Sequence, residues 1–159
     1  AQICRQLGLT DAQIAHGLAT YPGLPHRMER VCEAGGVIYI NDSKATNGAS
    51  TAPALAAYPR VHWIVGGLPK TDNLDECIPN FGHVVKAYTI GEAGPLFYEL
   101  LSPHLPVERS EMMGAAVHSA APQAKPGDVI LLSPACASFD QFKDFEARGD
   151  AFRAIVEAL

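Results

Sequence analysis

Three short segments of this 159-residue chain are rich in side chains that could bind a charged ligand. They are residues 41–47 (Asn-Asp-Ser-Lys-Ala-Thr-Asn), 66–72 (Gly-Gly-Leu-Pro-Lys-Thr-Asp) and 133–141 (Ser-Pro-Ala-Cys-Ala-Ser-Phe-Asp-Gln). Each segment follows a short apolar run that is typical of a buried strand. Because the carboxyl ends of parallel strands open onto the same edge of a sheet, we expect the three segments to surround one ligand site.

In the first segment Asp42, Lys44 and Thr46 alternate, and an extended backbone would direct their side chains to the same side. The carboxylate could accept hydrogen bonds from ribose hydroxyls, and the ammonium could neutralise a phosphate or a carboxylate. The structural alternative is that residues 42–47 only turn the chain and cap the next helix. The residues by themselves leave both interpretations open.

The other two segments have similar double interpretations. Gly66 and Gly67 would let the backbone approach a ligand that Lys70 attracts, but a plain loop with a surface lysine has the same pattern. Ser138 and Gln141 match a capping box, which predicts that a helix begins directly after Ser138. The Ser138 hydroxyl can cap this helix and also contact a ligand, because a hydroxyl both accepts and donates.

Strands and helices alternate along most of the chain. Gly35-Gly36 predicts a hairpin, and five strand–helix alternations follow it. This order predicts an α/β, Rossmann-like fold with a mostly parallel sheet, helices on both faces and an N-terminal β-hairpin edge. We interpret residues 1–22 as a lead-in helix and linker from a preceding domain, and residues 23–159 as the domain itself.

Composition and short motifs exclude several classes of function. The net charge is −5 and there is no basic block, which argues against nucleic acid as a partner. No apolar run approaches the ~20 residues of a membrane span. Four cysteines and six histidines lack the spacing of a metal site, and we interpret Cys136 as a packing residue without a neighbouring base. There is neither a G-x-x-x-x-G-K-[ST] loop for a triphosphate nor a G-x-G-x-x-G turn.

Several segments together resemble the C-terminal part of the Mur ligases, in the same order and from about residue 23 to the end. The segments are residues 23–29 (Gly-Leu-Pro-His-Arg-Met-Glu), 41–47, Gly66-Gly67 with Lys70, and 132–140 with 145–149 (Phe-Glu-Ala-Arg-Gly). Ser-Lys-Ala-Thr at 43–46 favours the D-glutamate-adding member of the family. The resemblance implies a monomeric, cytoplasmic enzyme of three domains. An N-terminal domain would bind a UDP-sugar peptide, and a central ATPase domain would carry the P-loop and the Mg²⁺ sites.

The resemblance also implies a reaction and a role for each matching residue. ATP would phosphorylate the carboxylate of UDP-N-acetylmuramoyl-L-alanine, and the amine of D-glutamate would attack the acyl phosphate. Arg27 would reach the ATP phosphates, Asp42 the ribose, and Lys44 the reacting phosphate or the substrate carboxylates. The D-glutamate pocket would consist of Thr46, Lys70, Ser138, Phe139 and Phe145. Without a P-loop, this domain is expected to be inactive alone.

Two alternatives remain open at this point. The chain could be a stand-alone α/β module that binds a small molecule, or the same domain of a sister Mur ligase that adds a different amino acid. All of these interpretations lead to the same expectation about where three side chains lie. Thr46, Lys70 and Ser138 should gather around a single hollow, of a size that suits a dianion, at one rim of the sheet.

Overall fold

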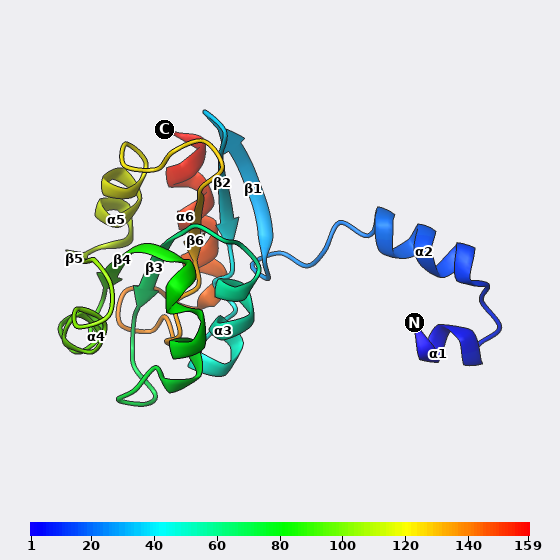
Figure 1. Cartoon of the computed structure of the whole chain (residues 1–159), viewed down its shortest axis with the longest axis horizontal. Helices are drawn as coiled ribbons and strands as arrows, with labels where there is room; N and C mark the ends of the chain where they lie inside the picture. Colours follow the sequence, from blue (N-terminus) through cyan, green and yellow to red (C-terminus); the bar gives the residue numbers. More distant parts are fainter.

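The computed structural model describes residues 1–159 and contains one six-stranded sheet with the order β1-β2-β6-β3-β4-β5 (Figure 1). The hairpin strand β1 runs antiparallel to β2, and all other neighbouring strands are parallel. The expected mostly parallel sheet with a hairpin at its edge is confirmed. The strands are β1 (Glu29–Ala34), β2 (Val37–Asn41), β3 (Val61–Gly66), β4 (Val84–Ile90), β5 (Val107–Glu111) and β6 (Val129–Leu132).

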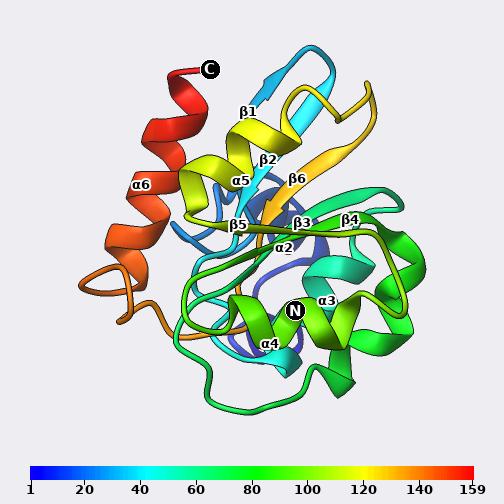
Figure 2. The same cartoon turned by 90° about the vertical axis from the view of Figure 1, so that its left-hand side faces the viewer.

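Helices cover both faces of the sheet (Figures 1 and 2). One face packs against α3 and α4 in a core that includes Leu55, Trp63 and Phe97. The other face packs against α5 and α6 through a second core that includes Tyr88 and Phe152. The helices are α1 (Gln2–Gln6), α2 (Asp11–Thr20), α3 (Gly48–Ala56), the 3₁₀ helix η1 (Asp75–His83), α4 (Gly94–Leu101), α5 (Met113–Ala120) and α6 (Phe145–Glu157).

The first twenty residues form two helices instead of the single helix that the sequence predicts. α1 ends where Gly8 adopts a left-handed φ of 85°, and α2 begins at a capping box of Thr10 and Gln13. Both helices lie apart from the sheet (Figure 1), and Ile14 is their one buried residue. Apolar side chains such as Ile3, Leu7 and Leu18 are exposed.

The prediction that a helix begins directly after Ser138 is wrong. The Ser138 carbonyl accepts hydrogen bonds from the backbone N–H groups of Gln141 and Phe142, and these close an isolated turn. α6 begins only at Phe145, where the Asp144 carboxylate accepts a hydrogen bond of 2.7 Å from the backbone of Ala147. A carboxylate at the N-cap position also interacts favourably with the helix dipole, so Asp144 sets the start of the helix.

A buried polar cluster links β3, β4 and the residue just before β6. His62 on β3 lies 3.0 Å from the Tyr88 hydroxyl on β4 and 3.2 Å from the Asp128 carboxylate, just before β6. Asp128 also accepts hydrogen bonds from Arg60, at 2.6 Å, and from the backbone of Lys125. Burial favours the neutral imidazole and lowers the pKa of His62.

This cluster predicts that acid destabilises the fold. Burial alone would raise the pKa of Asp128, but the hydrogen bonds from Arg60, Lys125 and His62 outweigh it and hold the pKa below its usual 3.8. The folded chain therefore keeps Asp128 ionised at a lower pH than the unfolded chain does. The ionised Asp128 carboxylate therefore stabilises the folded state above pH ~3.8. This contribution is lost as the pH falls through the lower pKa of the folded state.

Asp128→Asn should therefore lower the melting temperature near neutral pH and flatten its dependence on pH in acid. The measurement is thermal unfolding of both chains at several values from about pH 6 to about pH 3. Asp11→Asn, which removes an exposed carboxylate paired with Arg5, is the control and should follow the unmodified chain. Parallel acid profiles for Asp128→Asn and the unmodified chain would contradict the prediction.

Candidate functional site

A pocket of ≈ 220 Å³ lies at the carboxyl edge of the sheet, where the loops after β2, β3 and β6 meet. Six of the eight predicted site residues line this pocket. Thr46, Lys70 and Ser138 are among them, so the expectation that these three surround one hollow is confirmed. Lys70 donates a hydrogen bond of 3.1 Å to the Thr46 hydroxyl. The six residues are Lys44, Thr46, Lys70, Ser138, Phe139 and Phe145.

The pocket carries two ammonium groups without carboxylate partners. Neither Lys44 nor Lys70 forms an ion pair, and the Lys44 ammonium lies 3.7 Å from the centroid of the Phe145 ring in a cation–π contact. Asp144 also lines the pocket, but its carboxylate caps α6. The pocket can therefore neutralise a ligand with two negative charges, because both cations remain available to it.

Gly67 brings the Lys70 loop next to Ser138. Leu68 and Ala137 exchange two backbone hydrogen bonds of 2.9 and 3.0 Å, so the two loops pair like a short piece of sheet. Gly67 has a φ of 133°, and a Cβ there would lie 2.3 Å from the Ala137 carbonyl oxygen. Glycine at this position is a steric requirement of the loop pairing, and the loop pairing positions Lys70.

Arg148 on α6 connects two loops that form walls of the pocket. The sequence-based interpretation did not assign it a role. The side chain is 1% exposed. Its guanidinium donates to the carbonyl and hydroxyl oxygens of Ser43, at 2.9 and 3.0 Å, and to the carbonyls of Cys136 and Ala137, at 3.0 and 3.1 Å. One side chain thus joins the loop that carries Lys44 to the loop that carries Ser138.

The buried guanidinium has no carboxylate partner. Burial lowers the pKa of Arg148 to about 10, which still leaves it positively charged at neutral pH. Its charge adds to that of the two lysines above it. The sequence contains a signal for this residue: Arg148 stands three residues after Phe145 and four before Phe152, so it interrupts the apolar face of a helix.

The other two predicted residues, Arg27 and Asp42, line a neighbouring pocket of ≈ 450 Å³. Lys44 lines this pocket as well, so its ammonium stands between the two hollows. Asp42 and Thr46 line different pockets, so the expected alternation of Asp42, Lys44 and Thr46 on one side holds only for neighbouring pairs. Ala45 donates a backbone hydrogen bond to the Asp42 carbonyl, which makes the segment a turn, and an extended strand would be needed for alternation.

Asp42 is almost fully buried and holds the entry segment of the domain in place. Its carboxylate accepts hydrogen bonds from the backbone of Met28, at 3.1 Å, and from the Ser133 hydroxyl, at 2.8 Å. Burial raises the pKa of Asp42 despite these two bonds and the nearby charge of Arg27. A carboxylate oxygen can accept more than one hydrogen bond, so a ligand hydroxyl in the adjoining pocket remains an acceptable partner.

His26 is a further residue that the sequence-based interpretation left without a role. His26 and Met28 adopt left-handed φ angles of 61° and 48°, which is unusual for residues other than glycine. The His26 ring packs edge-on against Phe145 and lies 3.0 Å from the Asn41 amide, while its carbonyl accepts from the Lys44 backbone. These contacts fix Arg27, which stands between the two strained residues.

Three further features of the chain bear on other kinds of chemistry. Cys136 is fully buried, and burial raises the pKa of its thiol to about 12, so it packs and does not react. No group of three or more His, Cys, Asp or Glu side chains could hold a metal ion. None of the helices is both long and apolar enough to cross a membrane.

Comparison with known proteins places this arrangement in a family. The family model for the Mur ligase, glutamate ligase domain matches residues 26–136. The chain is 69% identical over 158 residues to the UDP-N-acetylmuramoylalanine–D-glutamate ligase of Novosphingobium aromaticivorans, which covers 99% of this chain and 36% of that protein. It is 59% identical over 161 residues to the protein of the same name in Sphingopyxis alaskensis, over 98% of this chain and 37% of that protein.

Solved structures share the fold at low sequence identity. The bifunctional folylpolyglutamate synthase/dihydrofolate synthase of Yersinia pestis, complexed with AMPPNP and a Mn ion, superposes with a TM-score of 0.63 at 20% identity over 93% of this chain and 35% of that chain. MurF from Acinetobacter baumannii gives 0.53 at 15% identity over 79% of this chain and 31% of that chain. The protein belongs to the Mur ligase family, and it spans about a third of the length of the curated relatives it matches.

Proposed function

We propose that this chain is the C-terminal domain of a UDP-N-acetylmuramoylalanine–D-glutamate ligase, and that the pocket of ≈ 220 Å³ binds D-glutamate. The observation that carries the proposal is that two ammonium groups, those of Lys44 and Lys70, line one small pocket and neither has a carboxylate partner. D-Glutamate has two carboxylates, and ammonium and hydroxyl donors are suitable partners for them. Thr46 and Ser138 supply the hydroxyls, while Phe139 and Phe145 form apolar walls for the methylene groups.

The neighbouring pocket of ≈ 450 Å³ is the proposed nucleotide side of the same site. Arg27 would contact the phosphates of ATP, and Asp42 would accept a hydrogen bond from the ribose. Lys44 would stand between the nucleotide and the amino acid, where it can stabilise the negative charge of an acyl phosphate as the amine attacks. Mg²⁺ would be held mainly by parts of the ligase outside this chain.

In the complete enzyme, ATP would convert the carboxylate of UDP-N-acetylmuramoyl-L-alanine into an acyl phosphate. The amine of D-glutamate would attack its carbonyl carbon, and the tetrahedral intermediate would collapse to the amide with release of phosphate and a proton. We propose that this chain orients the amine of D-glutamate, because binding both carboxylates of D-glutamate leaves its amino group free. The enzyme is proposed to act as a cytoplasmic monomer in the synthesis of peptidoglycan precursors.

An amino-acid panel tests this assignment. In the complete ligase that carries this domain, D-glutamate should support ATP-dependent release of phosphate and formation of the amide, while L-glutamate, L-lysine and D-alanine should not. Preference for a different amino acid would assign the domain to a sister ligase. Calorimetry of the 159-residue chain alone gives the second readout. Tight, micromolar binding of D-glutamate would argue for a stand-alone binding module, because the opposite wall of the site would then be unnecessary.

A further inference from the structure

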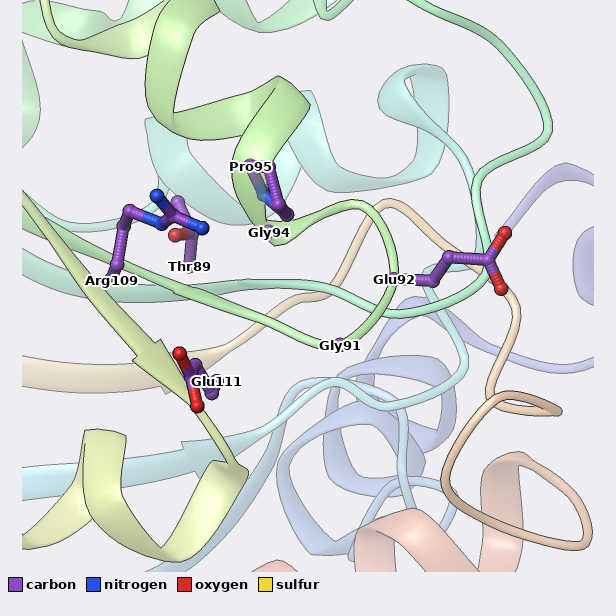
Figure 3. Close-up of a pocket in the computed structure, with 7 residues that line it drawn as sticks. All are labelled: Thr89, Gly91, Glu92, Gly94, Pro95, Arg109 and Glu111. Carbon is purple, nitrogen blue, oxygen red and sulfur yellow. The ribbon is translucent and has the colours of Figure 1, made fainter.

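A separate pocket of ≈ 260 Å³ lies where β4 and β5 end and α4 begins. It shares no lining residue with the pocket proposed for D-glutamate. Figure 3 shows the Arg109 guanidinium beside Thr89 and turned toward Gly94 and Pro95 at the start of α4, with Glu111 farther along β5. Glu92 also lines the pocket, but its carboxylate extends away from Arg109 (Figure 3).

The two charged side chains of β5 in this pocket are not paired. Neither Arg109 nor Glu111 forms an ion pair or a side-chain hydrogen bond, although Lys86 and Glu108 on the adjoining strands form an ion pair of 2.7 Å. Thr89 is 1% exposed, and its hydroxyl makes only a long contact of 3.4 Å to the Glu108 carbonyl. The pocket thus presents a free cation, a free anion and a hydroxyl that is weakly engaged.

The backbone keeps the two charges apart. Arg109 is paired in register with Thr89 and Glu111 with Ile90, and the register shifts between these two pairs. Glu111 has a left-handed φ of 63°, and its carbonyl accepts hydrogen bonds of 2.9 Å from the Gly91 backbone and from the Gln141 side chain. This irregularity is held by hydrogen bonds from two other loops, so the separation of the charges is built into the fold.

We propose that this pocket is a second ligand site, which binds a small zwitterionic α-amino acid. The carboxylate of the ligand pairs with Arg109 and accepts a hydrogen bond from Thr89, and its ammonium pairs with Glu111. A ligand with both charges satisfies both side chains, whereas a simple anion leaves Glu111 facing a like charge. The volume of ≈ 260 Å³ leaves room for an amino acid of ordinary size. This inference does not rest on the proposed function.

The first experiment compares three probes on the unmodified 159-residue chain by ¹H–¹⁵N NMR. L-Alanine carries both charges, acetate only the negative charge and ethylammonium only the positive charge. L-Alanine should shift the amide signals of Gly91, Gly94 and Glu111 in a saturable manner, with an affinity at least about tenfold higher than that of either single-charge probe. A response to acetate as strong as the response to L-alanine, or no saturable shift of these signals, would overturn the proposal.

The second experiment uses variants. Arg109→Gln and Glu111→Gln should each weaken L-alanine binding about tenfold or more, while Glu99→Gln, an exposed carboxylate on α4 outside the pocket, should leave it unchanged. Equal binding by all three variants would refute the assignment.

Lys70→Ala separates this site from the one proposed for D-glutamate, because it removes a cation of that pocket and none of this one. L-Alanine should still shift the signals of Gly91 and Gly94 in this variant, and loss of the response would place the ligand in the other pocket. Asp140 accepts from the Glu92 backbone, so the loop that carries Ser138 also touches this pocket. Signals of residues 138–141 are therefore not used as reporters.

Discussion

Replacing Arg148 with methionine should lower the free energy of unfolding of the chain by roughly 3–5 kcal/mol. The guanidinium is buried and donates four hydrogen bonds, three of them to carbonyls of Ser43, Cys136 and Ala137. A buried acceptor that loses its partner costs about 1–3 kcal/mol. Relief from burying an unpaired charge offsets part of that loss, which is why the expected effect is smaller than the sum.

Urea denaturation followed by circular dichroism measures this change, and Arg153→Met is the matched control. Arg153 lies on the same helix, but its ion pairs with Glu29 and Asp150 are partly exposed, so its loss should be small. The two variants remove the same charge from the same element. Equal destabilisation by both would contradict the role given to Arg148, since that role depends on burial between two loops.

Replacing Lys70 with alanine in the complete ligase should raise the KM for D-glutamate by roughly 10- to 150-fold. A hydrogen bond to a charged group is worth about 1.5–3 kcal/mol, and every ~1.4 kcal/mol is a factor of ten. The KM for ATP should change little, because Lys70 does not line the pocket that contains Arg27 and Asp42. Steady-state kinetics with D-glutamate as the varied substrate is the measurement.

Lys143→Ala is the control for Lys70→Ala. Lys143 lies close to the pocket in sequence, but its side chain is 89% exposed and its contact with Asp144 is long, at 3.9 Å. Its removal should leave both KM values unchanged. An unaltered KM for D-glutamate in Lys70→Ala would remove this lysine from the amino-acid pocket, and a parallel rise in both variants would point to a general effect of net charge.

The sheet could be predicted from local patterns because its strands are short apolar runs separated by turn signals. Gly35 and Gly36 have the left-handed φ angles that a tight hairpin needs, and the sequence Gly-Gly is a direct signal for them. The meeting of the three polar segments followed from topology, since parallel strands present their carboxyl ends at one edge. Local chemistry and chain connectivity were sufficient for these features.

Contacts between distant segments could not be predicted in the same way. The start of α6 was misplaced because Ser138 and Asp144 are both acceptable N-caps, and only the folded loop decides between them. The burial of the Asp42 carboxylate depends on hydrogen bonds from Met28 and Ser133, which are distant in sequence. The role of Arg148 depends on carbonyls from two loops, and carbonyls are present in every residue, so no side-chain pattern marks them.

The separation of α1 and α2 from the sheet has a consequence for how the chain tolerates substitution. Neither helix contributes a residue to the two apolar clusters that hold the sheet together. Amino-acid replacements at positions such as Ile3 and Leu18 should therefore be nearly silent in the folding of this body. If replacements at those positions nevertheless impair the protein in a living cell, the cause must be the loss of a contact between these helices and a surface outside this folded body.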